Sequence, residues 1–144
     1  MMLKSKLAAF AGALILAGSA FANQQIICPD INEIKAEGLD RVESIHQDND
    51  TMFLTYHFSN YNTPDMYAFF IAPVAGDTSE EALDTANEIL NTISGQGVPT
   101  QDHGIMLCVY HTGHQDLIAA AMKTNLSVSP MQLKQYFLQS HKAH

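Results

Sequence analysis

The chain has 144 residues, and 7 Lys and Arg against 15 Asp and Glu give it a formal net charge of −8 at pH 7. So few basic side chains provide no source of counterion release on nucleic acid and no attraction to anionic lipid, which excludes both as expected partners. The length suits one domain with a single core, and no linker, low-complexity tract or internal repeat divides it.

The first 22 residues have the pattern of a bacterial secretory signal peptide. Lys4 and Lys6 precede an apolar run from Leu7 to Ala17, and Ala20-Phe21-Ala22 supplies the small side chains of a cleavage site. The run is shorter than the roughly 20 residues that span a bilayer. We therefore expect a single soluble domain over residues 23–144, exported to the periplasm or secreted, with no stable membrane insertion. Cleavage would remove two lysines and no acid, so the charge becomes −8 − 2 = −10.

The chain contains two cysteines, Cys28 and Cys108. After export they meet an oxidising compartment, where paired thiols normally form a disulfide. We predict a Cys28–Cys108 bridge that ties the start of the mature chain to a later strand, and closing a loop of this length contributes about 4 kcal/mol in the chain-entropy model. The Cys-x-x-Cys spacing that favours metal or redox chemistry is absent.

The first predicted element is a short helix over residues 31–37. Asp30 and Glu33 have the spacing of an N-terminal cap, and Gly38 provides a stop. Its two isoleucines share one face, so we expect the helix to pack on a sheet near the disulfide.

Strands are predicted next. Residues 51–58 are rich in β-branched and aromatic side chains, and the acidic and amide residues at 48–50 separate them from residues 41–47 as a turn would, which predicts a β-hairpin. After a second turn ending at Thr63-Pro64, the continuous apolar run from Met66 to Ala72 predicts a strand buried on both faces.

The second half begins with a capping box, Thr78-Ser-Glu-Glu81, which predicts an amphipathic helix ending near Gly95. Gly97-Val-Pro99 predicts a break in regular structure. Residues 104–110 then predict a central strand that carries Cys108.

Residues 117–122 are ambiguous between helix and strand because alanines dilute the periodicity, but their length and the preceding strand favour a second hairpin. Ser129-Pro-Met-Gln132 predicts a closing helix to about Gln139. The elements add up to an α+β domain of order α-β-β-β-α-β-β-α, with a mostly antiparallel sheet of about five strands and helices packed on one face. The other face would remain partly open, where an apolar surface could bind a ligand.

Seven histidines make a ligand site the main chemical hypothesis. Imidazole and phenolate are both axial ligands of haem iron, and two Tyr-His pairs could meet if their strands were adjacent. The alternative is that the histidines are exposed strand or turn residues and that the tyrosines pack in the sheet. The candidate haem ligands are Tyr56, His57, Tyr110, His111 and His114.

Metal and catalytic motifs are weak. His111 and His114 alone do not make a zinc pattern, so we predict no metal site, and the alternative is a loose divalent-ion site between residues 102 and 116 that also uses Asp102, His103 and Asp116. The sequence has no nucleophile elbow, no Gly-rich phosphate loop and no free thiol once the cysteines pair. We therefore predict that the protein is not an enzyme.

Several local patterns match a known family, and they span most of the expected mature chain: Cys28-Pro-Asp-Ile31, Ile34-Lys-Ala-Glu-Gly38, Leu54-Thr-Tyr-His57, Tyr61-Asn-Thr63, Ile71-Ala-Pro73, Ser79-Glu-Glu-Ala-Leu83, Asn87-Glu-Ile-Leu90 and Tyr110-His-Thr-Gly113. On these patterns the chain resembles a family of small secreted bacterial proteins described as a domain of unknown function, some members of which are labelled hemin-binding protein. The resemblance implies haem binding but carries over no binding residues. Without a Cys-x-x-Cys-His motif, the haem would be held non-covalently.

The first hypothesis is therefore a secreted, non-enzymatic binding protein that holds hemin. The alternative is a secreted protein–protein interaction module without a small-molecule ligand, whose strand surface would carry Phe53, Tyr56, Tyr67 and Phe69. Haem binding requires an apolar cleft with His or Tyr at its wall, whereas the module requires a flat exposed patch or an edge strand.

Overall fold

The computed structural model describes residues 27–47, 50–102, 104–124 and 134–135. The predicted signal peptide lies outside these residues, as does the predicted closing helix apart from Lys134 and Gln135, which are helical. In the described part of the chain, no helix is long and apolar enough to cross a membrane.

Helix α2 (Ile31–Glu37) forms as predicted. The Asp30 carboxylate accepts a hydrogen bond from the backbone N–H of Asn32 at 2.8 Å, which satisfies one of the donors that a helix start leaves unpaired. The helix ends at Gly38, whose φ of 74° lies in the left-handed region that glycine adopts without strain. Its isoleucines are buried against the sheet, so this short helix is held by packing.

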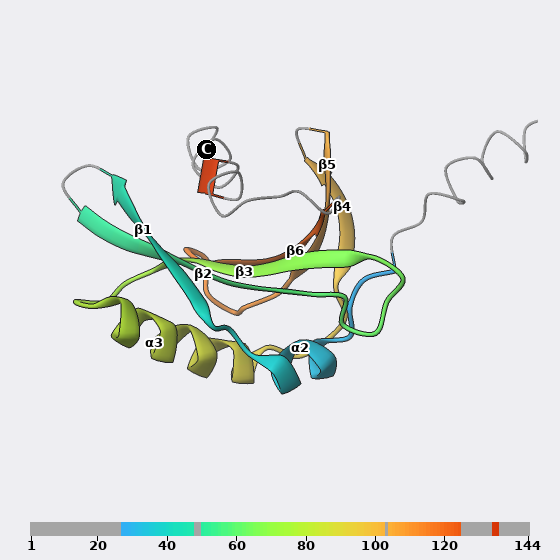
Figure 1. Cartoon of the computed structure of the whole chain (residues 1–144), viewed down its shortest axis with the longest axis horizontal. Helices are drawn as coiled ribbons and strands as arrows, with labels where there is room; N and C mark the ends of the chain where they lie inside the picture. The colour runs from blue at the N-terminus through green and yellow to red at the C-terminus, as the bar shows by residue number, and fades with distance from the viewer. Residues whose placement is uncertain (1–26, 48–49, 103, 125–133, 136–144) are drawn as a thin grey trace, which may run out of the picture.

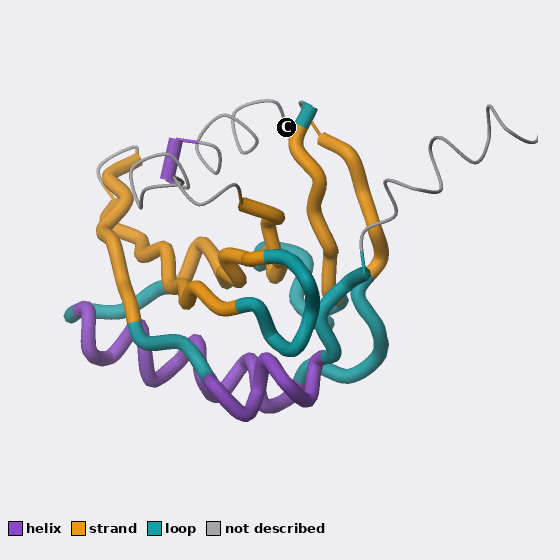
Figure 2. Tube along the Cα trace, turned by 45° about the vertical axis from the view of Figure 1, so that its right-hand side comes forward, coloured by secondary structure: helices purple, strands orange, loops and turns teal. Residues whose placement is uncertain are grey.

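Helix α3 (Ser79–Thr92) also begins at its predicted cap, because the Thr78 hydroxyl oxygen accepts a hydrogen bond from the backbone N–H of Glu81 at 3.1 Å. Its buried face, formed by Ala82, Ala86 and Leu90, contacts β1, β2 and β3. Helices α2 and α3 lie on the same side of the sheet (Figures 1 and 2).

Six strands form one antiparallel sheet with the order β1-β2-β3-β6-β5-β4. They are β1 (Arg41–Gln47), β2 (Asp50–Ser59), β3 (Met66–Val74), β4 (Val98–Asp102), β5 (Ile105–Tyr110) and β6 (Ile118–Thr124). The prediction of about five strands in the chain order α-β-β-β-α-β-β-α is wrong, because three strands follow α3. Strand β6 inserts between β3 and β5, so the sheet is continuous from one hairpin to the other.

The missed strand is β4, which begins inside the segment predicted as a break. Pro99 cannot donate a backbone hydrogen bond, but β4 is an edge strand and only its inner side needs donors for the ladder. Gly97 is explained by crowding: a Cβ there would lie 2.7 Å from the ring of Tyr110. Gly97 therefore directly precedes β4, and Pro99 lies within this edge strand.

The two predicted hairpins are confirmed. β1 pairs with β2, and β5 pairs with β6. The alanines of β6 alternate between the two faces of the sheet, and each is paired in the ladder with larger residues of β3 and β5. Strand β3 is buried on both faces along most of its length, as its continuous apolar run predicted.

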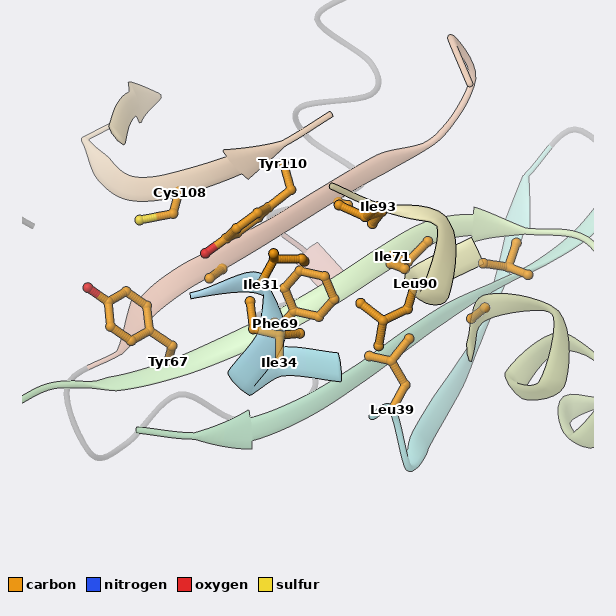
Figure 3. Close-up of a cluster of buried hydrophobic side chains, with 14 of the residues drawn as sticks. Ile31, Ile34, Leu39, Tyr67, Phe69, Ile71, Leu90, Ile93, Cys108 and Tyr110 are labelled. Carbon is orange, nitrogen blue, oxygen red and sulfur yellow. The ribbon is translucent and has the colours of Figure 1, made fainter. Parts of the chain in front are cut away.

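Both faces of the sheet carry buried side chains. The helix-covered face forms the larger cluster, in which Ile34 and Leu90 pack on Phe69 and Ile71 (Figure 3). On the opposite face, nine further residues that include Phe70 are also buried. The predicted open apolar face is therefore not found among the described strands.

The disulfide between Cys28 and Cys108 is confirmed, with a Cα–Cα distance of 5.6 Å. Two buried tyrosines reinforce it. Tyr67 donates its hydroxyl proton to the carbonyl of Ile27 at 2.9 Å, and Tyr110 donates to the carbonyl of Pro29. The segment that leads into α2 is therefore fixed to both β3 and β5.

Candidate ligand-binding cleft

A cleft of about 780 Å³ lies at one end of the sheet, where β4 runs beside the turn that connects β5 to β6. Its volume falls in the range of about 300–1,000 Å³ that is common for small-molecule sites. Val98, Val109, Leu117 and Ile118 give it apolar walls. Because Val98 is directly opposite Val109 in the ladder, their side chains share one face of the sheet.

The β5–β6 turn places two histidines at the cleft. Within it, the Thr112 hydroxyl accepts from the backbone N–H of His114 and donates to its carbonyl, both at 2.9 Å. Gly113, with φ 80°, allows the tight reversal. The residues His111 and His114 are exposed, and among the described residues no hydrogen bond or ion pair engages either ring. Their ring nitrogens are therefore available to a ligand.

The cleft is nearly neutral. Apart from the two histidines and Tyr110, the residues that line it cannot ionise, and none of the described Lys or Arg side chains is among them. An apolar ligand therefore meets no charged group that would have to be desolvated at the wall, and a ligand's own charges would have to remain in solvent.

His57 has a different environment. It lies on β2, where its Nδ1 is 2.7 Å from Asp40 Oδ1 and its Nε2 is 3.1 Å from Glu37 Oε1. Burial lowers the pKa of His57, but the hydrogen bonds and negative charges of Asp40 and Glu37 outweigh burial, so the pKa is raised above its ordinary value of 6.5. Because both nitrogens face carboxylates, neither offers a lone pair to a metal ion.

Tyr56 and Tyr110 are each only 2% exposed. Burial raises the pKa of both hydroxyls, with the negative charge of Glu43 adding to the effect at Tyr56 and the neighbouring Tyr67 and Asp30 adding to it at Tyr110. The phenolate form, which would bind iron, is therefore disfavoured at neutral pH. The Tyr110 ring contributes to the cleft as part of its wall.

The structure brings together His111, His114 and Tyr110 but not the Tyr56-His57 pair. In the sheet, His57 is level with Cys108, and β3 and β6 lie between their strands. Three strand spacings of about 4.8 Å each therefore separate His57 from Cys108 by roughly 14 Å. Strand β2, which carries His57, and strand β5, which His111 follows, are thus not neighbours.

The other predicted positions do not converge on a site. Phe53, Tyr56, Tyr67 and Phe69 are all buried, so they present no surface to a protein partner. For the divalent-ion alternative, His103 lies outside the described residues, and those described contain no group of three or more His, Cys, Asp or Glu placed to hold a metal ion.

Sequence reasoning missed the β4 wall of the cleft, Val98 and Thr100. The two residues alternate around Pro99 and point to the same face of the sheet, a period-2 signal that the proline obscured.

Comparison with known proteins identifies a family. Neither curated proteins nor solved structures provide a similar chain. A family model described as "Domain of unknown function (DUF4949)" matches residues 27–136, which include the disulfide, α2, α3 and strands β1 to β6. The chain therefore belongs to the DUF4949 family.

Proposed function

We propose that the protein is an exported, non-enzymatic binding protein that holds hemin non-covalently in the cleft beside β4. The observation that carries this proposal is the combination, in one cleft, of apolar walls with the imidazoles of His111 and His114, which bond to none of the described side chains. The disulfide is consistent with export, because such bonds persist in oxidising compartments.

The apolar walls would bury a face of the porphyrin, which is favourable at about 25 cal/mol for each Å² removed from water. Imidazole nitrogen would bind the iron. Because His111 and His114 belong to one turn that lines the cleft, either imidazole could supply this iron ligand, and the other could replace it. Since none of the described Lys or Arg side chains lines the cleft, the propionates would point outwards into water.

A hemin titration of the oxidised protein tests the proposal. We expect a saturable, stoichiometric shift of the Soret band in the wild type, a weaker response in either His111→Ala or His114→Ala, and loss of the shift in the double variant. His46→Ala is the matched control, because His46 is exposed on β1 and does not line the cleft. A nonsaturating wild-type response, or an unchanged double variant, contradicts the proposal.

A further inference from the structure

Two carboxylates from separate segments, those of Glu37 and Asp40, meet the imidazole of His57, and we call these three residues the latch. Glu37 is the last residue of α2, Asp40 lies in the connection to β1, and His57 lies on β2. The Ser59 hydroxyl donates to the second oxygen of Glu37 at 2.7 Å, which fixes the orientation of that carboxylate. The latch therefore ties the end of α2 and the following connection to the sheet.

The two contacts of His57 can both be favourable in only one protonation state. A neutral imidazole has one N–H donor, so one of its nitrogens would turn a lone pair towards a carboxylate oxygen. The imidazolium has two donors and satisfies Asp40 and Glu37 together, as charge-assisted hydrogen bonds. With 20% of its side chain exposed, His57 remains in contact with solvent and can exchange its proton.

We propose that protonated His57 closes a pH-dependent latch between α2 and β2, and that loss of one proton releases Glu37 or Asp40 and loosens the α2–β1 connection. Two other ionisable side chains lie nearby. Tyr61 packs edge-on at 6.2 Å and donates its hydroxyl to the His57 carbonyl, while Arg41 extends over the Phe58 ring. Among the described residues, no Lys or Arg forms an ion pair with either latch carboxylate.

A second contact limits how far the connection opens. The Asn87 side-chain oxygen accepts from the Leu39 N–H at 2.9 Å, and its amide nitrogen donates to the Leu39 carbonyl at 3.1 Å. An amide does not titrate, so Leu39 stays attached to α3 when the latch opens. The loosening should therefore concentrate at Asp40. Its backbone N–H donates a long hydrogen bond to the Tyr56 carbonyl, with an N···O distance of 3.4 Å.

The direction of the pH effect follows from the raised pKa of His57. The latch is closed below the ordinary histidine value of about 6.5 and opens as pH rises through the higher value of the folded protein. A lower pH closes it again, because no covalent change is involved.

The first test is an NMR titration of the His57 ring in the wild type, Glu37→Gln, Asp40→Asn and the double variant. We expect the pKa of His57 to fall in each single variant and further in the double variant. Glu37 and Asp40 are largely at the surface, with side chains 39% and 57% exposed, so the variants should fold. An unchanged pKa in the double variant would overturn the proposal.

The second test is backbone amide exchange at Asp40 as a function of pH, corrected for the intrinsic exchange rate. The wild type should lose protection at Asp40 as pH rises through the measured pKa of His57, while Leu39 keeps its protection. His57→Gln should lack this step, and the matched control His46→Gln should retain it. A step of equal size in His57→Gln would show that another group controls the connection and would reject the latch.

Discussion

His57 and the pair His111 and His114 show two opposite uses of histidine in one sheet. His57 is enclosed by two carboxylates at 2.7 and 3.1 Å, so both its nitrogens serve the fold. The rings at the β5–β6 turn are exposed beside an apolar cleft and engage none of the described side chains. The residue type therefore does not indicate a binding site, because the neighbouring acids decide whether an imidazole remains available.

The largest expected effect is a difference in the free energy of unfolding between variants at two places, the α2 interface near His57 and the wall of the cleft near His111 and His114. Ile34 is completely buried where α2 meets the sheet, so Ile34→Ala should lower the free energy of unfolding by about 2–5 kcal/mol. Leu117→Ala, at the half-buried cleft wall, should cost clearly less. Denaturant unfolding of both variants measures the difference. Equal losses would mean that the cleft wall supports the fold as strongly as the α2 interface.

The second prediction concerns the cleft itself. Leu117→Asp places a carboxylate on its apolar wall, so hemin affinity should fall by about 2 kcal/mol, or about 30-fold. Leu117→Met, which keeps the wall apolar, is the matched control. Soret titrations of the two variants provide the measurement, and equal affinities would exclude this wall from the site.

The smallest effect belongs to the latch. Because the folded pKa of His57 is raised, its contribution to stability is complete below about pH 6.5 and is lost as pH rises through the folded value. His57→Gln should remove this pH dependence, at a cost of about 0.5–1 kcal/mol at low pH. Urea unfolding at several pH values measures it, with His46→Gln as the control. If the free energy of unfolding of the wild type rose with pH through that window, the predicted sign would be wrong.

Sequence reasoning succeeded where structure is determined locally. The caps at Asp30 and Thr78 depend on residues two or three positions away, and the apolar run of β3 reports burial directly. The bridge between Cys28 and Cys108 was predictable because two cysteines allow one intramolecular pairing.

The failures involve positions that depend on the whole sheet. Pro99 is compatible with a strand only because β4 lies at the edge, and the sheet order is not encoded near that residue. The partners of His57 are 17 and 20 residues away, so its local sequence could not separate a ligand from a latch. The cleft wall likewise combines β4 with a turn that follows β5.

The central position of β6 has a consequence for the order in which the fold can be completed. The β1-β2-β3 meander and the β4–β5 hairpin share no ladder of their own, and β6 joins them. A chain that has emerged only to residue 117 lacks β6, so β3 and β5 have no ladder partner on the sides that β6 would join. Completion of the sheet therefore waits for β6, and a chain threaded through a membrane from its N-terminus would complete this sheet only after β6 had crossed.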